Sequence, residues 1–512
     1  MYGVPYKFSF RVANLPYFLV ITFGCKVNQC DSAGMAQGLV RRGWEPAPPG
    51  AAPDAVLVNT CTVTGRADQQ ARQAIRRLGR DYPDAAIWVT GCYAQRAPEE
   101  LAALPGVQMA LGNREKAGLA DLVASMTSGF TPLSDLESGA RRNGFLPVPL
   151  WGEGQGESEP GESLAVDRLG DEFYPWPATP LPGHTRARLK IQDGCNHRCT
   201  YCIVPRVRGG SRSLAWGRVA AALQELAARG YQEVVLTGVD LGQYGRDLDP
   251  PGTLAALLNR VRSGCVANTA DSTAELFIMP SNYTENRQPT TENDLTGRAR
   301  PFRLRLSSLE PQEVTPELLE ACAGLPGFCP HFHLPLQSGA APVLHAMGRP
   351  YTPGDFRDLV LNIRRGFPDA ALGLDVLVGF PGETASDFEA TRDLVASLPA
   401  TYLHVFPFSP RPGTPAALMP RVPAGEVRKR AKVMRDLGRL KKQQFLQSQL
   451  GKIREVLVEG PASESGWLQG LSDNYLRVAF PGPPAWRNQR IWVRLVRLQR
   501  EVLAGEAVTE AE

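Results

Sequence analysis

Six of the ten cysteines in this 512-residue chain fall into two groups of three, and each group could bind most of an iron–sulfur cluster. The compact group consists of Cys195, Cys199 and Cys202, and the spread group of Cys25, Cys61 and Cys92. A cubane cluster usually has four thiolate ligands, so three thiolates leave one iron open to another ligand. The sequence therefore predicts two clusters, each with a position at which chemistry can take place.

The composition is that of a globular protein with several domains. Hydrophobic residues make up 43% of the chain and charged residues 21%, and a chain of this length is expected to form about two to four domains. No apolar run is long enough to span a membrane, and residues 15–21 are interpreted as a first strand rather than a signal peptide. We therefore expect a cytoplasmic protein without membrane association, in which patterned cysteines more often bind metal than form disulfides.

The spread cysteines each follow a predicted strand in an N-terminal α/β domain over residues 18–126. Strand, helix and strand are predicted in turn at residues 55–60, 67–80 and 85–90. This alternation predicts a parallel sheet packed with helices. Because ligands gather at the carboxyl ends of such strands, the spread cysteines are expected to meet at one edge of the sheet.

The compact cysteines follow the first strand of a second βα region, over residues 186–447. The strands predicted in this region lie at residues 187–192, 233–237, 303–307, 331–336, 373–378 and 402–406. Six βα units predict an α/β fold of the partial (β/α)6 barrel type. Barrel enzymes keep their active sites at the carboxyl ends of the strands, so the loop with the compact group is expected at the top of the barrel.

Two segments interrupt the βα pattern. Residues 127–185 are rich in Gly, Pro, Glu and Ser, which predicts a poorly ordered linker or insertion. Residues 262–298 are polar, which predicts a disordered loop inserted in the barrel. The cysteines outside the two groups are expected to have no role in metal binding: Cys30, Cys265, Cys322 and Cys329.

The C-terminal part combines a basic connector with a small β-rich region. Residues 421–455 read as a helical connector and carry an excess of eight positive charges. Over residues 448–507, alternating apolar and polar residues with Gly and Pro turns predict a small β-barrel.

The run from Cys195 to Cys202, Cys-Asn-His-Arg-Cys-Thr-Tyr-Cys, resembles the cluster motif of the radical S-adenosylmethionine (SAM) superfamily. The resemblance implies that the open iron chelates the amino and carboxylate groups of SAM, and that the cluster reduces SAM to give a 5′-deoxyadenosyl radical. Residues near SAM are then expected to include Tyr201, Gly238 and Ser307. A zinc site is the alternative, but structural zinc sites are closed by a fourth ligand.

The sequences around the spread cysteines resemble the N-terminal domain of the methylthiotransferases, a radical SAM family. The runs are Gly24-Cys25-Lys26-Val27-Asn28-Gln29, Asn59-Thr60-Cys61-Thr62-Val63-Thr64 and Thr90-Gly91-Cys92-Tyr93-Ala94-Gln95. The resemblance implies a second [4Fe–4S] cluster whose open iron binds the sulfur to be transferred. It covers most of the chain and implies that the C-terminal β-barrel is similar to the TRAM module, an RNA-binding fold. The segments near residues 127–182 and 262–298 depart from the family pattern.

The methylthiotransferase family divides by substrate. Two branches act on carbon 2 of adenosine 37 in tRNA, one on the isopentenyl form and the other on the N6-threonylcarbamoyl form, and a third modifies an aspartate of a ribosomal protein. The runs around Cys25 and Cys61 look most like those of the threonylcarbamoyl branch. Our main hypothesis is therefore a tRNA methylthiotransferase acting on N6-threonylcarbamoyladenosine 37, with the other two branches as alternatives.

Basic residues after Cys61 are consistent with an RNA substrate. Arg72, Arg76 and Arg80 are four residues apart, so they form one stripe on the predicted helix. We expect this stripe to contact tRNA phosphates; a merely solvated helix face is the alternative. The resemblance also implies an electron donor such as a flavodoxin or ferredoxin. A monomer is expected, and the sulfur source stays open.

Two further hypotheses come from other classes of protein. One is a radical SAM enzyme of another kind, in which the spread cysteines are structural. Iron content separates it from the main hypothesis, with about eight irons per chain for two cubanes and about four for one. The other is a non-catalytic RNA-binding metalloprotein, which would fail to cleave SAM under strong reductant.

Overall fold

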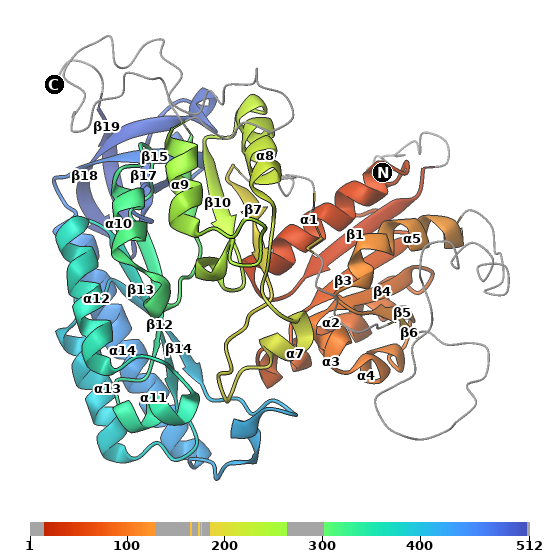
Figure 1. Ribbon diagram of the computed structural model, residues 1–512. Helices are drawn as coiled ribbons and strands as arrows, with labels where there is room; N and C mark the ends of the chain where they lie inside the picture. The colour runs from red at the N-terminus through yellow and green to blue at the C-terminus, as the bar shows by residue number, and fades with distance from the viewer. Residues whose placement is uncertain are drawn as a thin grey trace, which may run out of the picture. The chain divides into compact units, whose positions relative to one another are not determined.

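The computed structural model describes residues 15–127, 164–165, 173–174, 176, 185–263 and 302–508. The chain divides into two compact units, Met1–Gly170 and Asp171–Glu512 (Figure 1). The predicted linker at residues 127–185 and the predicted barrel insertion at residues 262–298 lie largely outside the described residues, and Cys265 lies outside them as well.

The first unit contains a parallel sheet packed with helices, as the sequence predicts. In the order in which they lie side by side, its strands are β2 (Glu45–Pro46), β1 (Tyr17–Thr22), β3 (Ala55–Thr60), β4 (Ala86–Gly91), β5 (Val107–Leu111) and β6 (Leu164–Ala165). Its helices are α1 (Lys26–Val40), α2 (Gly65–Asp81), α3 (Cys92–Arg96), α4 (Pro98–Ala102), η1 (Glu115–Gly118) and α5 (Leu119–Thr127). Every residue of β3 is buried, which fits a central strand of a sheet covered on both faces. Helix α2 begins after Thr64, whose hydroxyl accepts a hydrogen bond from Ala67 N at 3.2 Å.

The barrel strands of the second unit lie close to their predicted positions. They are β7 (Ala187–Lys190), β10 (Glu233–Thr237), β11 (Arg303–Leu306), β12 (His331–Gln337), β13 (Ala371–Val378) and β14 (Tyr402–Pro407). The helical segments between them are α7 (Val204–Arg208), α8 (Trp216–Ala228), η2 (Leu241–Gln243), α9 (Leu254–Arg262), η4 (Pro311–Glu313), α10 (Pro316–Ala323), α11 (Ala341–Met347), α12 (Pro353–Gly366) and α13 (Ala385–Ser397). Short strands β8 (Gln192–Asp193) and β9 (Arg212–Ser213) pair on either side of the compact cysteine group.

The barrel strands form two parallel half-sheets, β11-β10-β7 and β12-β13-β14, rather than one continuous sheet. An isolated bridge joins Leu304 of β11 to Phe328, and Cys329 N donates to Leu304 O at 2.8 Å. Proline has no N–H to donate to a ladder, and Pro330 and Pro335 stand just before and within β12. The predicted partial barrel is therefore assembled from two half-sheets that meet at an irregular seam.

The C-terminal strands close into a barrel in the order β15-β16-β17-β19-β18. Their bounds are β15 (Ile453–Pro461), β16 (Trp467–Ser472), β17 (Arg477–Pro481), β18 (Arg490–Gln499) and β19 (Val502–Ala507), with η6 (Pro484–Trp486) before β18 and η5 (Pro415–Leu418) earlier in the chain. The basic connector forms α14 (Ala424–Ser448), which ends sooner than the predicted 421–455 segment. Gly451 has a φ of +82°, a conformation that favours glycine and turns the chain out of the helix into β15.

Buried arginines of β11 fix the C-terminal barrel to the rest of the second unit. Arg303 and Arg305 both pair with Glu233 of β10, at 2.5 and 2.8 Å. Arg303 also donates to the backbone oxygen of Glu455 at 2.8 Å, and Arg305 to that of Asp473 at 2.9 Å. Charge-assisted hydrogen bonds of this kind are among the stronger ones in proteins, so the two barrels are held by directional contacts.

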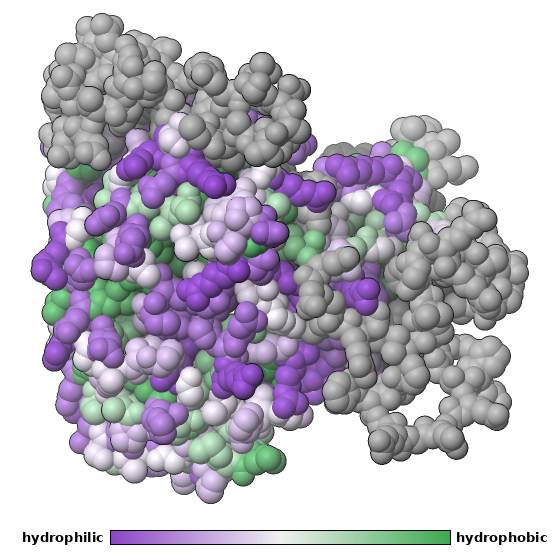
Figure 2. All heavy atoms as spheres, in the orientation of Figure 1, coloured by the Kyte–Doolittle hydropathy of each residue, from purple (hydrophilic) through white to green (hydrophobic). Residues whose placement is uncertain are grey.

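Hydrophilic side chains are spread over the face of the second unit that Figure 2 shows, with smaller hydrophobic areas among them. Individual large apolar side chains are exposed at scattered positions, such as Leu418 after β14 and Leu440 on α14. Single exposed apolar residues are normal on a protein surface. In the described parts of the chain, no helix combines the length and hydropathy needed to cross a membrane.

Candidate metal centres

The spread cysteines lie directly after three neighbouring strands of the first sheet. Cys25 follows β1, Cys61 follows β3, and Cys92 follows β4. The parallel register pairs Thr22 with Asn59 and Thr60 with Gly91, so these strands end at one edge. Since neighbouring strands are about 4.8 Å apart, three successive strand ends span about 10 Å. The sheet thus brings together the three cysteines that the sequence spaces widely.

Glycines before the spread cysteines allow this close approach. Gly24 has a φ of +94°, and a Cβ at this position would lie 2.6 Å from the Cβ of Cys61 and 2.9 Å from its Sγ. Gly91 has a φ of +103°, and a Cβ there would lie 2.4 Å from the backbone oxygen of Thr60. Only glycine fits such positions without displacement of the neighbouring chain.

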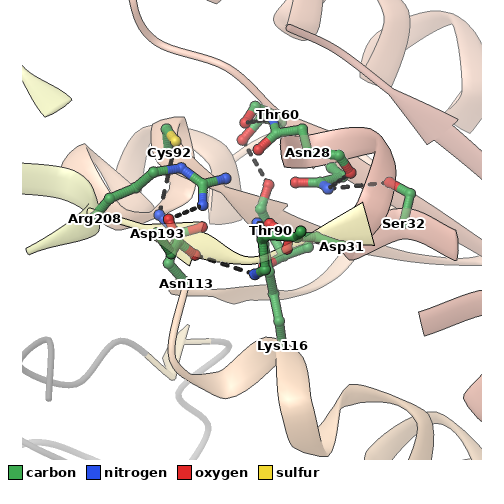
Figure 3. Close-up of polar contacts among 12 residues, drawn as sticks. Asn28, Asp31, Ser32, Thr60, Thr90, Cys92, Asn113, Lys116, Asp193 and Arg208 are labelled. Atoms are coloured by element: carbon green, nitrogen blue, oxygen red, sulfur yellow. Dashed lines mark hydrogen bonds and ion pairs between the residues drawn. The ribbon is translucent and has the colours of Figure 1, made fainter. Parts of the chain in front are cut away.

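Polar side chains hold the strand ends in place. Asn28 of α1 donates from Nδ2 to Phe23 O at 2.8 Å and to Thr60 O at 3.0 Å. Asn59 donates in return to Asn28 O at 2.9 Å. Asn113 points to the third cysteine, with 3.8 Å between its Nδ2 and the Cys92 Sγ (Figure 3). These contacts tie the segments around the spread cysteines to one another.

A buried ion pair joins helix α1 to η1 in the first unit. Lys116 Nζ is 3.0 Å from Asp31 Oδ2, and the two side chains are 3% and 2% exposed (Figure 3). Asp31 belongs to α1 and Lys116 to η1. Removing one partner of a buried pair is costly, so the pair fixes the position of α1, which begins directly after Cys25.

The compact cysteines lie in the loop between β8 and α7 of the second unit. Cys195 N donates to Gly209 O at 3.1 Å, which closes the base of the loop. The Thr200 hydroxyl donates to Ala346 O at 2.8 Å and Thr200 N donates to Met347 O at 2.9 Å. The end of α11 therefore shapes the middle of the cysteine loop.

Charged residues before this loop anchor its first turn. Asp193 accepts a hydrogen bond from Arg208 at 2.7 Å (Figure 3). It accepts another from Lys190 at 3.1 Å. Gly194 has a φ of +73°, and a Cβ there would lie 1.8 Å from Gly210 O. Only glycine fits at this position, where the chain enters the cysteine loop.

Acidic residues from the next two βα loops lie beside Cys195 and His197. Asp240 Oδ2 is 3.3 Å from the Cys195 Sγ. His197 Nε2 lies 3.1 Å from Asp240 Oδ2 and 3.3 Å from Glu313 Oε1, and the bonds to these two carboxylates raise the His197 pKa to about 10. Burial first, and the Asp240 charge second, raise the pKa of the Cys195 thiol. Burial also raises the pKa of the Cys202 thiol to about 12.

The surroundings of the compact group fit a bound cluster with a charged ligand. The three thiols lie in one loop, and buried polar atoms nearby have no hydrogen-bond partner among the described residues. These atoms are Asp240 Oδ1, Glu313 Oε2 and Arg349 Nε. Buried polar groups in proteins are nearly always satisfied, so acceptors and a donor of this kind suit a ligand that carries both charges, as an amino acid moiety does.

The structure brings together two of the three residues expected near SAM. Gly238 N donates to Ser307 Oγ at 3.3 Å, at the carboxyl ends of β10 and β11. Tyr201 lies instead in a hydrophobic cluster, where its ring packs edge-on against Phe380 with 6.4 Å between centroids. Burial raises the pKa of the Tyr201 hydroxyl. Contact of these three residues with SAM stays a prediction.

The arginine stripe on α2 is only partly available to a ligand. Arg76 and Arg80 are exposed, whereas Arg72 is half-buried. The Arg72 guanidinium hydrogen-bonds the Tyr93 hydroxyl and lies 3.6 Å from Glu100. Arg72 is thus held within the first unit, and an RNA contact of the stripe stays a prediction.

The residues that sequence reasoning missed come from loops of other βα units. Asp240, Glu310, Glu313 and Arg349 surround the compact cysteines, yet none belongs to a cysteine motif. Asp240, Glu310 and Glu313 follow the carboxyl ends of β10 and β11, which was the available signal for them, whereas Arg349 follows helix α11 and gave no such signal. Outside the two groups, Cys30, Cys322 and Cys329 are buried, as expected for cysteines that pack as small apolar side chains.

A further polar cluster lies on β12, β13 and β14. His333 Nε2 is 2.8 Å and His404 Nδ1 is 3.3 Å from Asp375 Oδ1, and the Ser308 hydroxyl is 2.7 Å from His333 Nδ1. Burial opposes ionisation of Asp375, but the two histidines outweigh it and lower the Asp375 pKa to about 2. The ring nitrogens of His333 and His404 and the Ser308 hydroxyl thus form one polar network around Asp375.

Comparisons with known proteins agree with this arrangement. Residues 17–112 match the family described as "Uncharacterized protein family UPF0004", and residues 189–395 match the radical SAM superfamily. The threonylcarbamoyladenosine tRNA methylthiotransferase MtaB of Rickettsia prowazekii is 32% identical over 90% of this chain and 92% of its own length. That of Thermotoga maritima is 33% identical over 90% of each chain.

A relative with another named substrate is also similar. The tRNA-2-methylthio-N(6)-dimethylallyladenosine synthase of Moorella thermoacetica is 32% identical over 96% of this chain and 98% of its own length. All three relatives are matched over nearly their whole length. The identity and coverage show that this chain belongs to the radical SAM methylthiotransferase family.

Proposed function

We propose that this protein is a tRNA methylthiotransferase that replaces the hydrogen on carbon 2 of N6-threonylcarbamoyladenosine 37 with a methylthio group. The observation that carries the proposal is the pairing of two three-cysteine groups, each at the carboxyl ends of parallel strands, in a chain of this family. When bound, two [4Fe–4S] clusters and SAM supply the radical, the sulfur and the methyl group. The protein contributes binding, orientation and exclusion of water.

Each cysteine group has a separate role in this proposal. Cys195, Cys199 and Cys202 hold the cluster that binds SAM, and the buried charges around them suit its amino and carboxylate groups. Cys25, Cys61 and Cys92 hold the cluster that presents sulfur. Gly238 and Ser307, which already contact each other, line the SAM side of the strand ends. Tyr201 supports the compact loop from its hydrophobic side.

The remaining parts bind RNA in this proposal. The TRAM-like β-barrel over residues 448–507 and the exposed Arg76 and Arg80 of α2 contact the tRNA backbone.

Residues 18–126 act as the sulfur domain and residues 186–447 as the radical SAM barrel. A one-electron donor such as a flavodoxin or ferredoxin serves a monomeric, cytoplasmic enzyme.

Nucleoside mass spectrometry tests the substrate. In tRNA from a strain that lacks the gene, the methylthio form of threonylcarbamoyladenosine is expected to disappear and to return on complementation. Persistence of that nucleoside at its normal level would contradict the proposal. Loss of the methylthio isopentenyl nucleoside instead would favour the activity named for the Moorella thermoacetica relative.

A further inference from the structure

Arg349 places a buried positive charge against one sulfur of the compact group. Its Nη1 donates to the Cys199 Sγ at 3.6 Å and to Glu310 Oε2 at 2.7 Å. The Arg349 side chain is 2% exposed, so water screens its charge weakly. A fixed cation in contact with a sulfur stabilises additional negative charge on that sulfur.

The position of Arg349 is set by the same turn that shapes the cysteine loop. Arg349 N donates to Leu344 O at 2.9 Å at the end of α11. Gly348, just before it, has a φ of +73°, and a Cβ there would lie 3.2 Å from Arg198 O. Because Thr200 also bonds this end of α11, a shift of the turn would move Arg349 and the loop together.

The sulfurs of the compact group therefore have different electrostatic surroundings. Cys199 faces the Arg349 guanidinium at 3.6 Å, whereas Cys195 faces the Asp240 carboxylate at 3.3 Å. Hydrogen bonds to the sulfurs, local charge and solvent exposure set the reduction potential of an iron–sulfur cluster. A donor at one sulfur favours the reduced state, which carries one more electron.

We propose that Arg349 is a positioning residue that acts through the Cys199 sulfur to raise the reduction potential of the cluster held by the compact group. The reduction adds one electron from an external donor and makes or breaks no bond. Glu310 holds the guanidinium in place, and the buried Nε gives Arg349 a second donor for a cluster sulfide or for a bound ligand. The inference rests on the proposed function in one respect, namely that the compact group holds a [4Fe–4S] cluster.

The test is a redox titration followed by electron paramagnetic resonance, with dithionite as the reductant. Full-length protein with Cys25→Ala, Cys61→Ala and Cys92→Ala serves as the background, so that one cluster gives the signal. In that background we compare Arg349→Gln and Arg349→Lys with Arg357→Gln, which removes an exposed arginine of α12.

Arg349→Gln is expected to reduce the equilibrium constant for one-electron reduction at least tenfold, which corresponds to a midpoint lower by about 59 mV. Arg349→Lys keeps the charge but not the planar donor, so its midpoint is expected to lie between those of the background protein and Arg349→Gln. The midpoint of Arg357→Gln is expected to equal that of the background protein. Unchanged midpoints in both Arg349 variants at full iron content would overturn the inference. If Arg349→Gln fails to load iron, the Arg349→Lys midpoint decides in the same way. A background protein that binds no iron at all would overturn the proposed function, and the inference with it.

Discussion

Gly24 and Cys61 lie so close that a Cβ on Gly24 would stand 2.6 Å from the Cβ of Cys61. Gly24 follows β1 and Cys61 follows β3, and Gly24 directly precedes Cys25. Their contact is therefore the point at which the sheet joins two ligands of the spread group. It depends on a glycine with φ of +94°, which no other residue adopts without strain.

Gly24→Ala is expected to remove the cluster of the spread group and leave that of the compact group in place. The added methyl group must displace Cys61 or Cys25. After anaerobic reconstitution, the iron content should fall from about eight to about four per chain. Gly50→Ala is a matched control, because Gly50 also has a positive φ, +88°, but a Cβ there would meet nothing within 4 Å. Equal iron content in Gly24→Ala and Gly50→Ala would show that the close contact between Gly24 and Cys61 is not needed for cluster binding by the spread group.

Charge removal on the exposed side of α2 is expected to weaken tRNA binding in a salt-dependent way. The slope of log K for tRNA binding against log salt concentration is negative. Arg76→Ala and Arg80→Ala should each make it less steep by about 0.7–0.9, as the loss of one phosphate contact does. Arg77→Ala is the control, since Arg77 is 70% exposed but lies off the stripe and 3.8 Å from Asp81. If Arg76→Ala and Arg80→Ala show the same slope as the Arg77→Ala control, the stripe is a merely solvated helix face.

Arg72 is expected to behave differently from its two neighbours in the stripe. Because its guanidinium binds Tyr93 and lies 3.6 Å from Glu100, Arg72→Ala should lower the stability of the first unit, by about 1 kcal/mol for the hydrogen bond. Thermal unfolding and the salt slope, measured on the same samples, separate the two effects. A change in the salt slope without a change in stability would place Arg72 in the RNA contact instead.

Neutralising Glu233 is expected to destabilise the second unit and to change its pH dependence. Burial opposes ionisation of Glu233, but Arg305 and Arg303 outweigh it and lower its pKa from 4.5 to about 2. A lowered pKa stabilises the fold above pH 4.5, and this stabilisation is lost as the pH falls towards 2. Glu233→Gln leaves two buried guanidinium groups without their carboxylate, at a cost of about 3–5 kcal/mol.

Urea unfolding between pH 7 and pH 3 measures both effects of Glu233→Gln. The variant should lose part of the acid-dependent decrease in the free energy of unfolding that the parent shows. Glu225→Gln, which removes an exposed partner of Arg229, should change the free energy by less than about 1 kcal/mol. A Glu233→Gln protein as stable as this control would contradict the assigned role of the buried pair.

Much of the fold follows from local sequence signals. The apolar run at Ala55–Thr60 and the run at Glu233–Thr237 become β3 and β10 with the predicted bounds, because a strand buried on both faces needs an uninterrupted apolar run. The same parallel topology places the spread cysteines at one edge. The break between the barrel half-sheets was not predicted, because the effect of Pro330 depends on which strand lies beside it.

The electrostatic part of the site could not be predicted from the sequence. Asp240 and Glu313 reach the surroundings of the compact cysteines from the loops after β10 and β11, and Arg349 from the turn after α11. Which of the charged residues in these connections turn inward depends on backbone conformations such as the left-handed Gly348 at the end of α11. The motif identifies the ligands, whereas the charges around them follow only from tertiary structure.

The central claim is that each group of three cysteines holds one [4Fe–4S] cluster. Its most direct test is the iron and sulfide content per chain of the parent protein and two variants, one with Cys25, Cys61 and Cys92 changed to Ala and the other with Cys195, Cys199 and Cys202 changed to Ala. The account predicts about eight irons for the parent and about four for each variant. About four irons in the parent, with no loss in the spread-group variant, would contradict it.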